Sequence, residues 1–167
     1  MQITRSGSTI ALGEKGATIT IEPNTAVEIK STDTMRIDWP GEYEVQGVTV
    51  RAYPAESGLS LLVGSNDIRL FMPAESPLQL TEDDLEELSN FEILCVAAES
   101  SSWEAKAWKK FIEDIEPRII IFTEDGDTTE KLRKELGAEN VERVDSCEVS
   151  SKNLPSDAMR FVMLTER

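Results

Sequence analysis

The stretch Ile37-Asp-Trp-Pro-Gly-Glu-Tyr-Glu-Val-Gln-Gly-Val-Thr-Val-Arg51 carries the clearest fold signal of the chain. Pro40-Gly41 predicts a turn, and the apolar residues at alternate positions after it predict a strand. Gln46-Gly47 predicts a tight connection into a second strand, so the stretch is expected to form a β-hairpin. One face of this hairpin is apolar and is expected to pack on a core.

Further strand patterns surround the hairpin and extend from the first residues to about residue 72. Short segments rich in β-branched residues, separated by turn signals, predict an antiparallel meander with one buried face. These segments are Met1–Thr4, Thr9–Leu12, Ala17–Ile21, Ala26–Ile29, Met35–Ile37, Leu59–Val63 and Ile68–Met72.

The second half of the chain alternates helical and buried-strand patterns. Helices are predicted over 82–88, 103–115 and 127–136, and strands over 93–97, 118–122, 141–144 and 160–164. Ser101 and Glu104 match a capping box, and Asp127 is a predicted N-cap. The order of elements predicts an α+β fold in a single domain, residues 1–167, with helices covering sheet layers.

The chain contains no histidine among its 167 residues. Histidine is the usual general base near neutral pH and the commonest metal ligand. Its absence therefore excludes histidine-based triads and histidine-containing zinc sites, and leaves carboxylates, hydroxyls and thiols as candidate groups.

The net charge limits the partners. With 32 acidic and 17 basic residues the formal charge is −15, which argues against nucleic acid and anionic membranes as partners. The charge is explained by solubility, by a basic partner or by mimicry of nucleic acid. The sequence shows no apolar signal region and no apolar stretch of membrane-spanning length, so a cytoplasmic location is expected.

The two cysteines are far apart and form no CxxC pair. Cys95 lies in an apolar run and is expected in the core. Cys147 lies in a predicted polar loop, where it is either a free thiol or incidental. Two cysteines make neither a disulfide scaffold nor a closed zinc site.

The hairpin stretch resembles the Gly-Pro-Gly-Glu-Tyr-Glu-Val-x-Gly-Val-x-Ile-Arg signature of a small bacterial branch of the metallo-β-lactamase superfamily, the ascorbate-6-phosphate-lactonase-like proteins. Other stretches resemble this family in the same order, so the resemblance spans nearly the whole chain. They are Met1–Thr4, Leu80–Leu88 with Phe91–Leu94, Ile115–Ile121, and Ser151–Pro155 with Phe161–Leu164. The resemblance implies a reduced metallo-β-lactamase-like αββα sandwich.

The departures from the family are informative. The family binds two metal ions through a His-x-His-x-Asp-His loop, two further histidines and an aspartate turn. The interval between Ile21 and Met35 is too short for that loop. The other ligand positions correspond to Gly7-Ser8, Pro54–Ser57, Phe71–Glu75 and Ile121–Glu124, and none keeps its usual residue. The resemblance therefore implies the scaffold without dinuclear zinc chemistry, with no catalytic residue and no cofactor.

Two weaker chemical candidates remain. Glu75, Glu124, Asp125 and Asp127 form an alternative oxygen-ligand site for magnesium or calcium, which would make the protein a cryptic hydrolase. The favoured interpretation is that Asp127 caps a helix and its neighbours are solvated. The serines of Ser100–Ser102 are predicted to be helix caps, because neither a histidine nor a suitably spaced lysine activates them.

Tryptophans indicate where a partner could bind. Trp108 belongs to an apolar helix face and is expected in the core, whereas Trp39 and Trp103 are the candidates for an interface. The expected function is a non-catalytic binding or assembly module. It either associates with itself as a homo-oligomer or binds an unidentified protein partner, and an acidic decoy for basic proteins is a third hypothesis.

Overall fold

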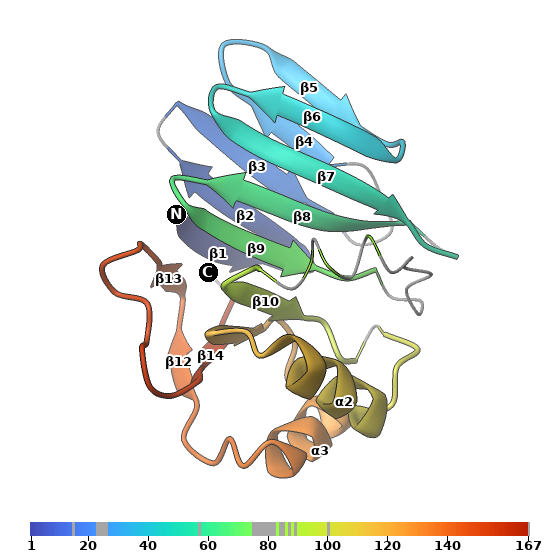
Figure 1. Ribbon diagram of the computed structural model, residues 1–167, viewed down its shortest axis with the longest axis vertical. Coiled ribbons are helices and arrows are strands. Elements are labelled where there is room, and N and C mark those ends of the chain that lie inside the picture. The colour runs from blue at the N-terminus through green and yellow to red at the C-terminus, as the bar shows by residue number, and fades with distance from the viewer. Residues whose placement is uncertain are drawn as a thin grey trace.

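The computed structural model describes residues 1–14, 16–22, 27–56, 58–74, 83, 86, 88, 90–99 and 101–166 (Figure 1). In this part of the chain the strands form a six-stranded and an eight-stranded sheet. The six-stranded sheet contains β1 (Gln2–Ser6), β2 (Thr9–Glu14), β3 (Ala17–Ile21), β4 (Val27–Lys30), β5 (Thr34–Ile37) and β13 (Ser146–Glu148), in the order β13-β1-β2-β3-β4-β5.

The eight-stranded sheet is mixed. It contains β6 (Gly41–Val45), β7 (Val48–Pro54), β8 (Leu59–Ser65), β9 (Ile68–Met72), β10 (Ile93–Val96), β11 (Ile119–Phe122), β12 (Glu142–Val144) and β14 (Arg160–Leu164), in the order β12-β14-β11-β10-β9-β8-β7-β6. Strands β6 to β9 are antiparallel, and β9, β10, β11, β14 and β12 are parallel. Helices α2 (Ala105–Ile115) and α3 (Asp127–Glu135) pack on this sheet.

The predicted meander is divided between the two sheets. The hairpin is confirmed as β6 and β7, with Tyr43 opposite Val50. Ile37, however, ends β5 in the other sheet, and the connector Asp38–Pro40 carries the chain across. This crossing lets the apolar faces of both sheets bury each other, which a single flat meander cannot do.

Two apolar cores result. One lies between the sheets and is built from alternate residues of their strands, such as Ile19 and Val63. The other lies between the eight-stranded sheet and its helices, where Trp108 and Leu132 pack against that sheet. Every residue of β10 and β11 is buried, as expected for strands covered on both faces.

The described residues therefore form three layers: a sheet, a second sheet and helices. The second helix layer of the predicted αββα sandwich is not found among these residues. Figure 1 shows α2 and α3 together, far from β5 and β6. The predicted helix at 82–88 lies largely outside the described residues, although Leu88 is helical and buried. None of the described helices is long and apolar enough to cross a membrane.

The prediction for Cys95 is confirmed, and the predicted loop position of Cys147 is wrong. Cys95 is buried in β10, as predicted. Cys147 lies in β13 rather than in a loop, opposite Ile3 of β1, and is also buried. Burial raises the pKa of both thiols because a low-dielectric environment disfavours the thiolate.

The predicted capping box is absent. Helix α2 begins at Ala105, and the Glu104 side chain makes no capping hydrogen bond. The Ser101 hydroxyl instead accepts the backbone N–H of Trp103 at 3.0 Å. Because the Ser101 hydroxyl bonds to this turn before the helix begins, it does not accept an N–H of the first helical turn.

Candidate functional site

The parallel strands β10, β11 and β14 end along one border of the eight-stranded sheet. We call this border, with residues 97–99, 123–127 and 165–166, the strand-end edge. The β1–β2 turn joins it, because the Gly7 N–H donates to the Glu166 carboxylate at 3.2 Å. The ends of β7 and β9 reach the same border, where the Ala74 N–H donates to the Ser60 hydroxyl at 2.8 Å. The topology thus brings Gly7, Ala74 and Glu124 to one border, while Ser57 and Glu75 lie outside the described residues.

Two carboxylates close the centre of this edge. Glu99 Oε1 accepts the N–H of Thr129, in the first turn of α3, at 2.7 Å. Glu124 Oε2 accepts the N–H of Glu99 at 2.9 Å. A carboxylate at a helix N-terminus satisfies an unpaired N–H and complements the helix dipole. Glu99 therefore caps α3 from a neighbouring loop.

Gly126 permits this cap. A Cβ atom at this position would lie 2.5 Å from Cδ of Glu99, closer than real Cβ contacts. The prediction that Asp127 caps α3 is wrong, because Asp127 is the first helical residue and Gly126 is the N-cap without a side-chain bond. The glycine before the helix was the available signal, but no local spacing rule links it to Glu99.

Further polar groups on this edge are satisfied within the chain. The Thr123 N–H and hydroxyl both donate to the Val96 carbonyl, at 3.0 and 3.2 Å. Since buried polar groups without partners are costly, these contacts tie the ends of β10 and β11 together.

The structure does not gather the predicted acidic site among the described residues. Glu124 is half-buried and bonded to Glu99. Asp125 is exposed and pairs with Arg143 at 2.8 Å. Asp127 is exposed at the start of α3, and Glu75 lies outside the described residues.

The donor set does not fit the dinuclear zinc chemistry of the family that the sequence resembles. The chain has no histidine. Among the residues that the structure describes, no three histidine, cysteine, aspartate or glutamate side chains are grouped to hold a metal ion. Structural and catalytic zinc sites need at least three such protein ligands.

A second border has the opposite character. Strand β5 is an edge strand of the six-stranded sheet and β6 is an edge strand of the eight-stranded sheet, and both lie on the same side of the molecule (Figure 1). We call residues 34–45 the lateral edge. Trp39, in its connector, is 73% exposed, the one large apolar side chain so exposed in the described part of the chain. The Tyr43 hydroxyl donates to the Trp39 carbonyl at 3.0 Å and holds the connector in place.

The other interface candidate packs inside the helix layer. The Trp103 ring lies 4.6 Å from that of Trp108 and 5.4 Å from that of Phe111, centroid to centroid. Trp103 is only partly exposed and belongs to the core beneath α2. Trp39 is therefore the candidate that an approaching partner meets first.

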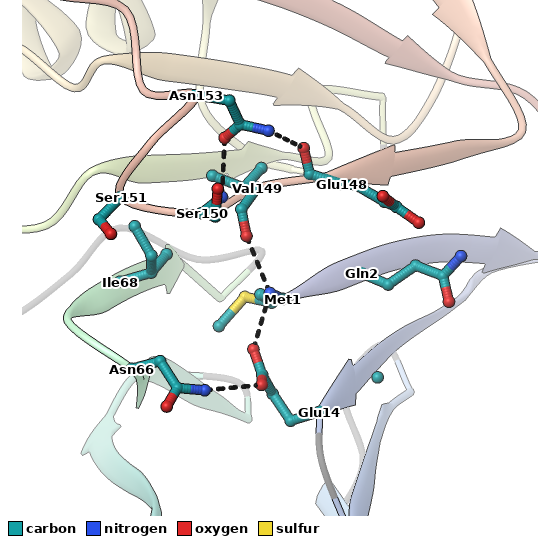
Figure 2. Close-up of a pocket in the computed structure, with 11 residues that line it drawn as sticks. Met1, Gln2, Glu14, Asn66, Ile68, Glu148, Val149, Ser150, Ser151 and Asn153 are labelled. Carbon is teal, nitrogen blue, oxygen red and sulfur yellow. Dashed lines mark hydrogen bonds and ion pairs between the residues drawn. The ribbon is translucent and has the colours of Figure 1, made fainter.

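A polar cavity of about 660 Å³ lies at the opposite end of the sandwich from the strand-end edge (Figure 2). The Met1 amino group lies 2.8 Å from the Val149 carbonyl and 2.8 Å from Glu14 Oε1. Asn66 donates to the other Glu14 oxygen at 3.0 Å. Asn153 accepts the Ser150 N–H at 2.7 Å and donates to the Glu148 carbonyl at 3.0 Å.

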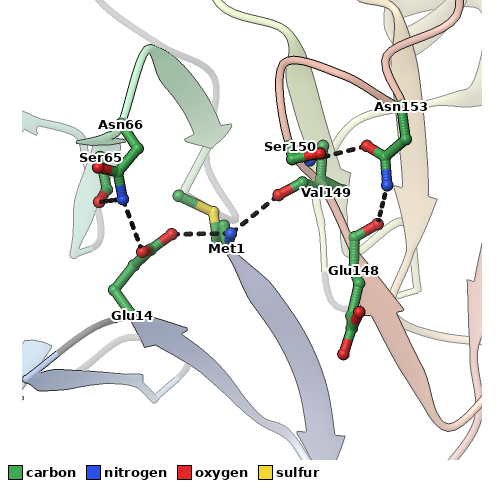
Figure 3. A network of polar contacts seen from close by, with 8 residues as sticks. All are labelled: Met1, Glu14, Ser65, Asn66, Glu148, Val149, Ser150 and Asn153. Carbon is green, nitrogen blue, oxygen red and sulfur yellow. Dashed lines mark hydrogen bonds and ion pairs between the residues drawn. The ribbon is translucent and has the colours of Figure 1, made fainter.

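Figure 3 shows that these contacts join elements far apart in sequence. The Glu14 carboxylate is only 6% exposed, and its ion pair ties β2 to the start of β1 and, through Asn66, to the β8–β9 turn. No local pattern in the sequence predicts this network, because its partners are separated by up to 148 positions. These polar groups form hydrogen bonds and an ion pair with one another, so the network links distant elements and stabilises the fold.

Comparison with solved structures identifies the fold. The chain is similar to a crystal structure from Thermotoga maritima, of a protein described as a candidate Zn-dependent hydrolase of the metallo-β-lactamase superfamily. The TM-score is 0.72, the identity is 19%, and the match covers 100% of both chains. No protein-family profile and no curated protein sequence matches the chain. The chain therefore has a metallo-β-lactamase-like α+β fold, and the likeness extends to the fold alone.

Proposed function

We propose that this chain is a non-catalytic binding or assembly module, one domain built on a reduced metallo-β-lactamase-like αββα scaffold. The observation that supports this most directly is the self-contained strand-end edge. Glu99 caps α3 at 2.7 Å, and Glu124 accepts the N–H of Glu99 at 2.9 Å. A dinuclear hydrolase needs imidazoles and carboxylates free to bind metal at such an edge.

The contacts already present disfavour a cation at this edge. Glu124 Oε2 accepts the Glu99 N–H, and Asp125 Oδ2 contacts Arg143. These contacts use part of the lone-pair capacity of each carboxylate. The guanidinium of Arg143 beside Asp125 also repels a cation.

The alternative function is a hydrolase that uses a divalent cation held by Glu75, Glu124, Asp125 and Asp127. Oxygen ligands of this kind suit magnesium or calcium, and calcium takes six to eight of them. This alternative makes a distinct prediction, because ligand binding to the folded state raises thermal stability.

The test is a thermal-unfolding titration with magnesium, calcium, manganese and zinc. Our proposal predicts no saturable rise in Tm with any of these ions. The matched variants are Glu124→Gln at the strand-end edge and Glu113→Gln on α2, where Glu113 is 62% exposed. A saturable rise that Glu124→Gln abolishes and Glu113→Gln preserves would favour the hydrolase.

A further inference from the structure

We propose that the partner of the lateral edge is a second copy of this chain, related by a two-fold axis parallel to β5 and β6. In this dimer, β5 of each copy pairs with β6 of the other. The inference rests on the proposed function and names the partner of the assembly module.

The backbone of the lateral edge offers two strands for pairing. In the described residues, β5 pairs only with β4, and β6 pairs only with β7. Each therefore presents one row of unpaired N–H and C=O groups, which is a template for another strand. The other two sheet borders, β12 and β13, are each shorter, at 3 residues.

The topology makes the pairing self-complementary. Because Asp38–Pro40 connects β5 directly to β6, the two strands run in opposite directions on facing sheets. A two-fold rotation about an axis parallel to them exchanges the sheet layers and preserves strand direction. It sets β5 of one copy antiparallel to β6 of the other, and it forms both joints at once.

The charges on the two strands are opposite. Arg36 on β5 and Glu44 on β6 are exposed, and neither makes an ion pair among the described residues. Glu42, by contrast, is engaged by Arg51 at 3.2 Å. In an antiparallel ladder that places Arg36 opposite Glu44 of the second copy, the opposite charges stabilise the pairing. The symmetry forms this contact twice.

The same register completes the apolar core. It places Met35 opposite Val45 of the second copy and Ile37 opposite Tyr43 of the second copy. Met35, Tyr43 and Val45 are partly buried hydrophobic residues that pack against the core between the sheets. Joining the sheets extends this core across the interface and removes more of these side chains from water.

The exposed tryptophan fits the same symmetry. The connector lies at the same end of the lateral edge in both copies, so the rotation brings the two Trp39 side chains together near the axis. Trp39 is 73% exposed in the single chain, and buried tryptophans near the centre of an interface carry much of its binding energy. The net charge of −15 on each copy opposes any approach of two copies, and the pairing of Arg36 with Glu44 offsets part of this repulsion at the lateral edge.

The test is sedimentation velocity of the full chain over a range of concentrations, with a charge swap. The wild type is expected to dimerise. Arg36→Glu and Glu44→Arg are each expected to raise the dimer dissociation constant about tenfold or more, because two attractive pairs become repulsive. The double variant Arg36→Glu/Glu44→Arg is expected to restore the dimer. Trp39→Ala is expected to weaken it without changing the circular dichroism spectrum.

The matched control is Arg118→Glu, since Arg118 is exposed and lies before β11, away from the lateral edge. It is expected to leave the dimer unchanged. A dimer that survives both single reversals, or a double variant that stays monomeric while folded, would overturn the pairing. A monomeric wild type that binds no metal overturns the pairing but leaves the proposed function intact. A monomeric wild type that binds metal overturns both.

Discussion

The strand-end edge and the lateral edge border the same sandwich, but they differ in whether their polar groups find partners among the described residues of the chain. At the strand-end edge, Glu99 and Glu124 accept backbone N–H groups of the same chain. At the lateral edge, β5 and β6 end their sheets, and Trp39 is exposed. Among the described residues, then, the strand-end edge is closed by contacts within the chain, whereas the lateral edge leaves one side of β5 and of β6 without a strand partner. Activity should not be inferred from the shape of the fold.

The largest expected difference is between two tryptophans. Trp108 is 1% exposed beneath α2, whereas Trp39 is 73% exposed. Trp108→Ala is expected to lower the free energy of unfolding by about 3–5 kcal/mol, because it leaves a cavity in the helix-side core. Trp39→Ala is expected to change that of the monomer by about 0.5 kcal/mol or less. Urea unfolding of dilute protein measures both, and equal losses would contradict the assigned environments.

The two buried cysteine thiols test whether the β13 border, at the other end of the six-stranded sheet from β5, is closed to solvent. Burial raises the pKa of Cys95 and of Cys147, which lies in the border strand β13. In the unfolded chain both ionise above about pH 8.5, while in the folded chain the raised pKa values shift ionisation to higher pH. The unfolded state then binds fewer protons, so stability falls as the pH rises, by at most about 1.4 kcal/mol per thiol per pH unit.

The measurement is urea unfolding at a series of pH values above about 8.5. Cys147→Ala is expected to make the free energy of unfolding less dependent on pH, because it removes the contribution of that thiol. Native protein is expected to resist thiol-specific reagents. Rapid labelling of Cys147 in the folded protein would show that the β13 border is open as well, and the contrast between the two borders would fail.

The helix cap is expected to have an intermediate effect. Glu99→Ala removes the carboxylate from the N-terminus of α3 and is expected to cost about 1 kcal/mol. Gly126→Ala forces the same carboxylate away, since a Cβ there would lie 2.5 Å from Glu99 Cδ. The double variant is expected to cost less than the sum, because both changes remove one hydrogen bond. Additive losses in a double-mutant cycle would disprove this shared mechanism.

The smallest effect is expected at the exposed pair of Asp125 with Arg143, whose side chains are 51% and 52% exposed. Asp125→Asn is expected to change the free energy of unfolding by about 0.5 kcal/mol or less, because solvent screens exposed ion pairs. A loss several times larger in urea unfolding would show that the strand-end edge depends on this pair as well as on Glu99.

The local elements of this fold are predictable from sequence, while their long-range partners are not. Alternating apolar residues predicted most strands, including the hairpin of β6 and β7. The same pattern does not show that Asp38–Pro40 moves the chain to another sheet, because alternation is identical in either sheet. Strand β13 was missed because it is short and polar, with Cys147 as its one buried residue.

The same limit applies to the candidate site. Trp39 is exposed beside the predicted turn at Pro40, and its role in an interface stays a prediction. The packing of Trp103 on Trp108 and the cap that Glu99 provides were not predicted, since both depend on tertiary contacts. Glu99 and Thr129 are 30 positions apart in the chain, and no rule of local spacing joins them.

The central claim is that this chain uses a metallo-β-lactamase-like scaffold for assembly rather than for metal chemistry. Native mass spectrometry of protein purified without chelators tests this claim most directly, because it reports bound metal and oligomeric state together. Our account predicts a metal-free dimer. A stoichiometric metal ion on a monomeric chain would contradict it.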